Sequence, residues 1–246
     1  MKVSVHGKGH EQMGINNQDA CLELVSGNKK VKIVCDGCTN VIAEKPETFS
    51  LTHNEVGARL FCSKYELLEN PFEEEKFEEN ANRIMKEMLD LVSFSKNLYD
   101  TSEKMKEYIS YHYLFTIYAC FETEDKFIVY YLGDGTILFE NDMGVMTYLQ
   151  RKFGKCPPYL AYNYINPEQA REFTRMEFDK KEIKRVGIAT DGIYPAIDEM
   201  DYHSKINFDN VLSNIHQLPD FNHSNSVSGF IMANSNLFYD DTTIVF

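Results

Sequence analysis

The order in which strands and helices follow one another restricts the fold of this chain more than any other feature. Strand-like runs come first, and two amphipathic helical patterns follow before the strands resume. The strand-like runs lie at 2–6, 20–25, 31–35, 113–121, 127–132, 136–139, 145–149, 172–178, 186–190 and 243–246. Because strands and helices do not alternate one by one, the pattern disfavours a parallel doubly wound sheet. We expect an α+β fold, a four-layer α-β-β-α sandwich of two antiparallel β-sheets flanked by helices.

Each helical pattern carries an apolar stripe, which predicts a face buried against a sheet. The first stripe consists of Val56, Leu60, Phe61, Leu67 and Leu68, and the second of Phe77, Ala81, Ile84, Met85, Met88, Leu89 and Val92. A mixed stretch at 198–217 also favours a helix. By contrast, residues 150–170 contain Pro157-Pro158 and Asn166-Pro167, which are typical of an irregular surface flap.

The composition favours a single folded domain over residues 1–246. With 43% hydrophobic residues the chain can bury a full core, and no linker-like stretch divides it. A formal net charge of −13 without any Lys/Arg cluster disfavours nucleic-acid binding. No apolar run reaches the length of about 18 residues that predicts a membrane span, and the first residues lack the apolar stretch of a secretory signal. We expect a cytoplasmic protein with no nucleic-acid or membrane partner.

The cysteines predict buried thiols more than a metal or redox site. Cys35 and Cys38 have the spacing of half a zinc site, but no second pair of this kind follows. The other four are Cys21, Cys62, Cys120 and Cys156. In the cytoplasm we expect all of them to be reduced.

Aspartates at the ends of strand-like runs carry the functional signal. Three runs end in Asp-Gly, with Asp36, Asp134 and Asp191, and two runs begin directly after Asp19 and Asp240-Asp241. In an antiparallel sheet the carboxyl end of one strand lies beside the amino end of its neighbour, so we expect these side chains to share one rim of the sandwich. A single Asp-Gly is usually an ordinary β-turn, but five such positions make coincidence a weaker explanation.

Carboxylates gathered in this way require a cation. Two carboxylates about 5 Å apart, at an effective dielectric constant of about 20, repel each other by roughly 3 kcal/mol. Oxygen ligands without histidine or cysteine suit Mg²⁺ or Mn²⁺ better than zinc or copper. A glycine after an aspartate allows a sharp turn and lets a carbonyl group approach an ion. The pattern therefore predicts a site for Mn²⁺ or Mg²⁺.

The same residues resemble the motifs of the metal-dependent protein phosphatases of the protein phosphatase 2C family. In chain order, the matching segments are Asn17-Gln18-Asp19-Ala20, Val34-Cys35-Asp36-Gly37, Leu132-Gly133-Asp134-Gly135, Ala189-Thr190-Asp191-Gly192 and Asp240-Asp241-Thr242-Thr243. Each motif is short, but together they span nearly the whole chain in the family's order. The resemblance is to a divergent bacterial-type subgroup, and it implies a β-sandwich flanked by helices.

The resemblance also implies an activity, namely the hydrolysis of phosphoserine and phosphothreonine in proteins with two to three Mn²⁺ or Mg²⁺ ions. A water activated between two ions attacks phosphorus in this family, so no cysteine or serine nucleophile is expected. The implied metal ligands are Asp36, which bridges two ions, the carbonyl group of Gly37, Asp191, Asp240, Asp19 through metal-bound water, and Asp134 at a third, weaker site. The implied partners are a phosphoprotein substrate and a cognate Ser/Thr kinase.

The chain departs from the family where phosphate is usually bound. Relatives carry an arginine five residues before the aspartate of the first motif, and this chain has Gly14 there. His10 and Lys8 are the candidates to replace that arginine. We expect His10 to act as a catalytic residue together with Asp19 and Asp36.

Two further departures concern the neighbourhood of the metal ions. Cys38-Thr39-Asn40 follows Asp36-Gly37, where many relatives have small glycines and some have a histidine that protonates the leaving group. Gln18 stands where many relatives have glutamate. These departures leave two alternatives to a protein phosphatase open. One is a phosphatase-fold regulatory or binding module with weak or no activity, and the other is a metal-dependent hydrolase of small phosphoesters.

Overall fold

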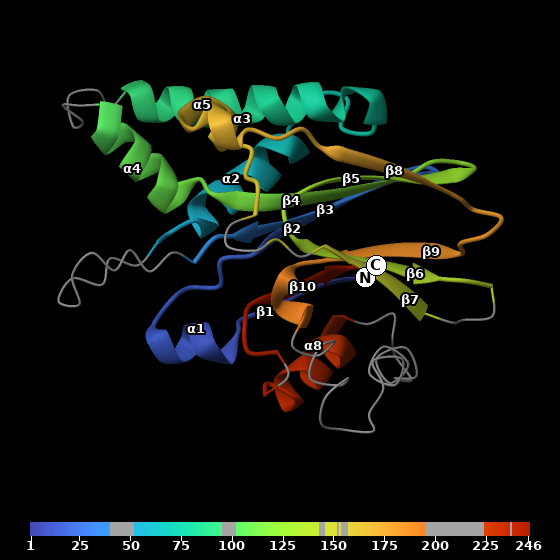
Figure 1. The fold of residues 1–246 in the computed structure, drawn as a ribbon. Coiled ribbons are helices and arrows are strands. Elements are labelled where there is room, and N and C mark those ends of the chain that lie inside the picture. The colour runs from blue at the N-terminus through green and yellow to red at the C-terminus, as the bar shows by residue number, and fades with distance from the viewer. Residues whose placement is uncertain are drawn as a thin grey trace.

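Two five-stranded sheets lie face to face in the computed structural model, and helices cover their outer faces (Figure 1). The structure describes residues 1–39, 52–94, 102–142, 146–151, 153, 157–194, 224–236 and 238–246. One sheet has the strand order β1-β10-β9-β6-β7, and the other has the order β2-β3-β4-β5-β8. Within this part of the chain, all neighbouring strands pair antiparallel. The α+β four-layer sandwich predicted from the order of the elements is confirmed.

The strands begin and end close to their predicted positions. The first sheet consists of β1 Lys2–Val5, β10 Thr242–Val245, β9 Arg185–Ala189, β6 Gly135–Glu140 and β7 Met146–Arg151. The second consists of β2 Ala20–Ser26, β3 Lys29–Gly37, β4 Phe115–Glu122, β5 Lys126–Leu132 and β8 Thr174–Asp179. The helices are α1 Lys8–Met13, α2 Glu55–Glu66, α3 Phe77–Phe94, α4 Ser102–His112, α5 Tyr162–Ile165 and α8 Ser224–Ala233, with short 3₁₀ helices at Glu74–Lys76, Pro167–Gln169 and Asp191–Ile193.

Three layers of buried side chains hold the sheets and helices together. The layer between the two sheets includes Val34, Tyr118, Val129, Ile188 and Val245. The layer between the second sheet and α2 and α3 includes Phe61, Tyr65, Phe77, Met88 and Phe121. The layer between the first sheet and α8 includes Val3, Leu138, Val227 and Ile231. Each such side chain contributes about 1.5–3 kcal/mol when fully buried, so the strand ends are held by a substantial core.

The predicted buried face of the first helix is partly wrong. Val56 is 43% exposed and Leu67, just beyond the end of α2, is 83% exposed. The buried residues of α2 include Gly57, Ala58 and Phe61. A Cβ atom at Gly57 would lie 2.5 Å from the carbonyl oxygen of His112, so the helix approaches its neighbours through its smallest residues. The buried face combines these small residues with Phe61 and Tyr65, and of the predicted stripe only Phe61 is fully buried. The predicted stripe of α3 is buried except for Leu89, which is partly buried.

The prediction of a surface flap at 150–170 is also wrong at the centre of this stretch, although Phe153 and Tyr164 are exposed. Tyr159, Leu160 and Ala161 are almost fully buried in the same core as α2 and α3. The short helix α5 directly follows this buried segment, and Pro167 begins a 3₁₀ helix after it. The helices α1, α4, α5 and α8 had not been predicted. The stretch at 198–217, Asn40 and Cys156 lie outside the described residues.

Candidate metal centre

Antiparallel pairing brings aspartates of the second sheet together at one edge of the sandwich. Ala20 at the start of β2 pairs with Cys35 near the end of β3. Asp19 precedes Ala20 and Asp36 follows Cys35, so the two aspartates continue the same register. Asp134 lies in the turn from β5 to β6, where the chain passes from the second sheet to the first.

The first sheet contributes two more aspartates at the same edge. β9 and β10 are neighbours, and the N–H group of Thr190 donates to the carbonyl oxygen of Thr243 at 3.0 Å. Asp191 directly follows this pair on one strand, and Asp240 precedes β10 on the other. A contact across the sandwich joins the two sheets here, because the Thr190 hydroxyl donates to Asp19 Oδ2 at 2.8 Å.

The proximity of these carboxyl groups raises their pKa values. Burial raises the pKa of Asp36 well above its ordinary value, and the charges of Asp191, Asp19 and Asp240 raise it further. Burial, with the charges of Asp134 and Asp240, raises the pKa of Asp191 to about 7. The carboxyl groups of Asp36 and Asp191 are in hydrogen-bond contact, which requires a proton on one of them when no cation is bound.

The remaining aspartates behave in the same way. Burial and the negative charge of Asp241 raise the pKa of Asp19 well above its ordinary value. Burial raises the pKa of Asp134 to about 6 and also raises that of Asp240, although His10 opposes the effect at Asp240. All five predicted aspartates therefore take part in one electrostatic cluster, and ionising all of them together costs free energy.

The cluster fits hard divalent cations. Asp19 is 4% exposed, and its Oδ1 atom has no hydrogen-bond partner in the part of the chain that the structure describes. A buried carboxylate oxygen without a donor costs free energy unless a ligand satisfies it. The five aspartates offer only oxygen atoms, which is the donor set that Mg²⁺ and Mn²⁺ prefer.

Two glycines let the backbone pack tightly around the cluster. A Cβ atom at Gly37 would lie 2.8 Å from the carbonyl oxygen of Gln18. At Gly192 the corresponding distance to the carbonyl oxygen of Asp241 is 1.9 Å. The glycines of these Asp-Gly pairs therefore allow close approach between neighbouring chain segments.

Changing Gly192 to Ala is expected to destabilise the protein by about 1–3 kcal/mol, because overpacking forces the backbone at Asp241 to move. Chemical unfolding monitored by circular dichroism measures the loss. Gly229 is the matched control, because it lies in α8 and a Cβ atom there meets nothing within 4 Å. Gly229→Ala is expected to be neutral or to stabilise by up to about 1 kcal/mol, because alanine favours helix. Equal stability of Gly192→Ala and the wild type would contradict the tight packing.

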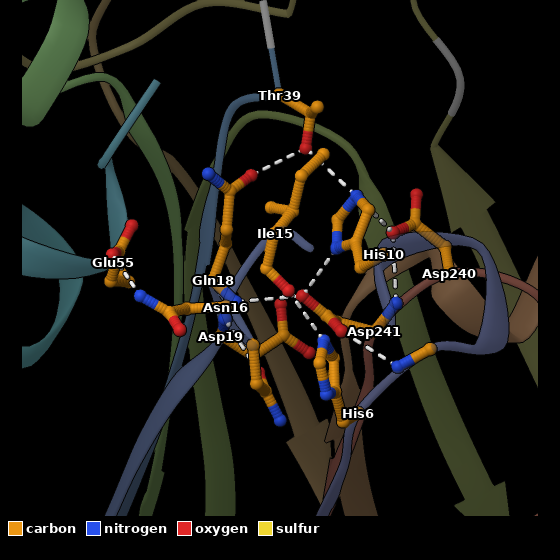
Figure 2. Close-up of polar contacts among 12 residues, drawn as sticks. His6, His10, Ile15, Asn16, Gln18, Asp19, Thr39, Glu55, Asp240 and Asp241 are labelled. Carbon is orange, nitrogen blue, oxygen red and sulfur yellow. Dashed lines mark hydrogen bonds and ion pairs between the residues drawn. The ribbon is translucent and has the colours of Figure 1, made fainter. Parts of the chain in front are cut away.

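His10 lies on α1 beside the cluster and contacts both members of the Asp240-Asp241 pair (Figure 2). Its Nδ1 atom is 2.7 Å from Asp241 Oδ2, and its Nε2 atom is 3.2 Å from Asp240 Oδ1 and 3.0 Å from the Thr39 hydroxyl. Burial lowers the pKa of His10, but the hydrogen bond to Asp241 and the nearby carboxylates outweigh it and raise the pKa above its ordinary value. Among the described residues, His10, Asp240 and Asp241 are the group of three whose ligand atoms all lie within 4.8 Å of one another.

The other candidates for phosphate binding lie elsewhere. The Lys8 ammonium donates to Asn236 Oδ1 at 3.3 Å, on the exposed side of the chain near α8. Gly14 ends α1 in the left-handed conformation, with φ of 70°, a position at which an arginine would be strained.

Cys35 and Cys38 are not a pair, because Cys35 Sγ contacts Cys62 Sγ at 3.9 Å in the core.

Three contributors to the site were not assigned from the sequence. Asp241 is 3% exposed and accepts hydrogen bonds from the N–H groups of Gly7 and Gln18, both at 2.7 Å. Thr190 holds Asp19, and Thr39 donates to Gln18 Oε1. Asp241 had a signal in the sequence as the second aspartate of the pair that begins the last motif, and Thr190 had one as the residue before Asp191.

Solved structures of bacterial phosphatases share this fold. The serine/threonine phosphatase Stp1 from Staphylococcus aureus is similar with a TM-score of 0.57 and 14% identity, over 99% of this chain and 92% of that one. PppA of Pseudomonas aeruginosa has a TM-score of 0.60 and 12% identity, over 99% and 94%. The catalytic domain of the serine/threonine protein phosphatase PstP, in complex with two manganese ions, has a TM-score of 0.60 and 15% identity, over 99% and 94%. No curated protein matches the sequence.

The antiparallel sandwich and these likenesses define the fold as that of the bacterial serine/threonine phosphatases. The sequence itself matches the family model described as "Protein phosphatase 2C" over residues 6–228. The chain belongs to the protein phosphatase 2C family. None of the helices in the described part of the chain combines the length and the apolar character needed to cross a bilayer.

Proposed function

We propose that residues 1–246 form one catalytic domain that hydrolyses phosphoserine and phosphothreonine in proteins with the help of two to three Mn²⁺ or Mg²⁺ ions. The observation that carries this proposal is the meeting of five aspartates from both sheets, among which a buried oxygen of Asp19 lacks a donor. Family membership supports the same conclusion, because phosphoprotein substrates are implied by it. We place the protein in the cytoplasm, where a cognate Ser/Thr kinase supplies its substrates.

Each aspartate has a proposed role as a ligand. Asp36 lies among the other carboxyl groups and suits a bridge between two ions, with the carbonyl group of Gly37 beside it. Asp191 and Asp240 would hold the second ion together with Asp36, and Asp134 with Asp191 would hold a third. Ions held in this way lower the pKa of water to supply a nucleophile and neutralise charge that develops on the phosphoryl group.

The remaining groups of the site orient these ligands and contact the substrate. Thr190 fixes one oxygen of Asp19, which leaves the other oxygen free to face the ions or their water. His10 directs Nε2 towards Asp240, and we propose that this nitrogen contacts the phosphate group in place of the missing arginine. Burial raises the pKa of the Cys35 thiol well above its ordinary value, so the cysteine next to Asp36 is a poor nucleophile.

The proposal is tested by turnover of a phosphoserine peptide and of p-nitrophenyl phosphate, each with Mn²⁺, with Mg²⁺ and with a chelator. We expect metal-dependent hydrolysis of both substrates and none with the chelator. Rapid turnover of the small phosphoester without turnover of any phosphopeptide would instead indicate a hydrolase of small phosphoesters. The absence of all turnover under saturating Mn²⁺ would exclude the proposed activity.

A regulatory or binding module is the second candidate, and the structure at Gly14 favours it. This position closes α1 and carries no side chain that can hold phosphate. A module of this kind still binds divalent ions through the aspartates but turns over neither substrate. Metal binding measured by calorimetry together with the two assays therefore separates the candidates.

A further inference from the structure

Asp241 is an almost fully buried acidic group beside the candidate metal centre, and the proposed ligand set does not use it. Its Oδ1 atom accepts the N–H group of Gly7 and its Oδ2 atom accepts the N–H group of Gln18, both at 2.7 Å. The Oδ2 atom also contacts His10 Nδ1 at 2.7 Å (Figure 2). Both oxygen atoms are therefore already occupied by protein groups, which argues against a place for Asp241 among the metal ligands.

The contacts of Asp241 determine which ring nitrogen of His10 faces the cluster. Both oxygen atoms of Asp241 already accept backbone N–H groups, so the geometry favours a proton on Nδ1 that is donated to Oδ2. This holds for both the neutral and the charged ring. Nε2 is thereby turned towards Asp240 and Thr39, at 3.2 Å and 3.0 Å. His10 is 6% exposed, so the surrounding protein leaves the ring little freedom to choose another orientation.

The same carboxylate also connects segments that are distant in sequence. Gly7 precedes α1, Gln18 precedes Asp19, and Asp241 follows Asp240. One side chain thus joins the loop before α1 to the starts of β2 and β10. A Cβ atom at Gly7 would lie 2.3 Å from the carbonyl carbon of Asp240, so this loop is packed directly on the last motif.

We propose that Asp241 is a positioning residue, which holds His10 with Nδ1–H bound and Nε2 presented to Asp240 and to the phosphate group of the substrate. The proposal rests on the proposed phosphatase function, because it explains how a histidine on α1 serves a site built from strand ends. Asp241 itself does not contact the substrate. Its effect on turnover passes through His10, and the loss of either residue removes the same contribution.

The first test is a double-mutant cycle on Mn²⁺-dependent hydrolysis of p-nitrophenyl phosphate. We expect His10→Asn and Asp241→Asn each to lower kcat/KM by about 10–100-fold, the range typical when a group that orients a metal-site residue is removed. The double variant is expected to be no slower than the slower single variant, because both changes remove one contribution. Losses that multiply in the double variant, or a wild-type rate for Asp241→Asn, would overturn the proposal.

A spectroscopic readout separates positioning from a merely structural role. Nitrogen-15 spectra of the histidine rings, recorded on the metal-free and Mg²⁺-loaded protein, report which ring nitrogen of His10 carries a proton. We expect a protonated Nδ1 in the wild type and a changed protonation pattern of the ring in Asp241→Asn. The NH₂ group of asparagine cannot accept a hydrogen bond at the place of a carboxylate oxygen. An unprotonated Nδ1 in the wild type would contradict the proposal directly.

A pair of isosteric variants decides the question if Asp241→Asn does not fold. Asparagine at position 10 places an N–H donor where Nδ1 was, whereas glutamine places one nearer to Nε2. We expect His10→Asn to match the wild type in melting temperature, His10→Gln to be less stable, and both to lose activity. The opposite order of stabilities, or wild-type activity of His10→Asn, would overturn the proposal.

Asp179→Asn is the matched control for the carboxylate-to-amide change. Asp179 Oδ1 accepts the backbone N–H group of Lys181 at 2.8 Å, and Asp179 pairs with Lys126 at the end of β5 remote from Asp134. We expect this variant to keep wild-type kcat/KM and an unchanged His10 spectrum. If the wild type hydrolyses no phosphate monoester, the proposed function fails, while the spectra and the melting temperatures still decide whether Asp241 holds His10.

Discussion

Changing Asp36 to Asn is expected to lower kcat/KM for phosphate monoesters by about 1000-fold or more, because metal ions supply several kcal/mol of transition-state stabilisation. Asp36 is in contact with Asp191 and within the field of Asp19 and Asp240, so its charge lies at the centre of the cluster. Hydrolysis of p-nitrophenyl phosphate under saturating Mn²⁺ measures the loss. Asp191→Asn is expected to behave in the same way.

The same substitution is expected to stabilise the metal-free protein by about 1–3 kcal/mol, because an amide at position 36 neither repels the neighbouring carboxylates nor has to take up a proton on folding. Unfolding in the presence of a chelator measures this gain. A substitution at a residue that only supports the fold would lower the stability of the protein. A loss of activity together with a gain in stability therefore identifies a functional site. Asp179→Asn is expected to alter neither quantity. Wild-type turnover by both Asp36→Asn and Asp191→Asn would show that the ligand assignment is wrong.

The edge at which the aspartates meet could be predicted from the sequence because strand geometry is simple. A run of alternating or continuous apolar residues predicts a strand, and antiparallel pairing then fixes which strand ends are neighbours. Asp19 and Asp36 meet through the single register of β2 and β3. The position of Asp134 could be predicted without knowledge of the strand register, because this residue lies in the turn between two predicted strands. The order of the elements was likewise sufficient for the fold class.

The partners of His10 could not be predicted in this way. Its contact with Asp241 spans 231 positions of sequence and depends on how the loop before α1 packs on the last motif. Strand periodicity carries no information about that packing. The prediction of the buried face of α2 was partly wrong for a related reason. This helix approaches its neighbours closely through Gly57 and Ala58, which the stripe of larger apolar residues does not indicate. Sequence patterns thus predicted the groups that lie on strand ends and missed the contacts that loop and helix packing creates.

The stability of the metal-free protein is expected to fall as the pH rises from about 4 to about 7, by about 3 kcal/mol in total. An aspartate in the unfolded chain has a pKa of about 3.9. Burial and neighbouring charges raise the folded-state pKa of Asp191 to about 7, and burial raises that of Asp134 to about 6. Between these values the folded protein holds more protons than the unfolded chain, so the free energy of unfolding decreases with rising pH. The raised pKa of His10 contributes with the same sign, because the stability it adds is lost as the ring deprotonates.

The figure of about 3 kcal/mol is smaller than the sum of the individual shifts, because Asp36 and Asp191 share one proton and partial exposure screens the charges. Asp36→Asn removes one member of that pair. We therefore expect a flatter dependence of stability on pH for this variant, and an unchanged dependence for Asp179→Asn. Denaturant unfolding in chelator at a series of pH values gives all three curves.

Added Mn²⁺ is expected to offset most of this dependence, which connects the pH effect to metal binding. The ion binds ionised carboxylates, so protons compete with it, and its stabilising effect grows as the pH rises. A ligand present at about 100 times its dissociation constant contributes about 2.7 kcal/mol, which is enough to offset most of the expected loss at neutral pH. Parallel unfolding curves with chelator and with Mn²⁺ should therefore diverge above about pH 5, where the carboxyl groups of the cluster begin to ionise. If the metal-free protein instead gained stability with rising pH, or if Mn²⁺ stabilised it equally at all pH values, the carboxyl groups would not form one coupled metal-binding cluster.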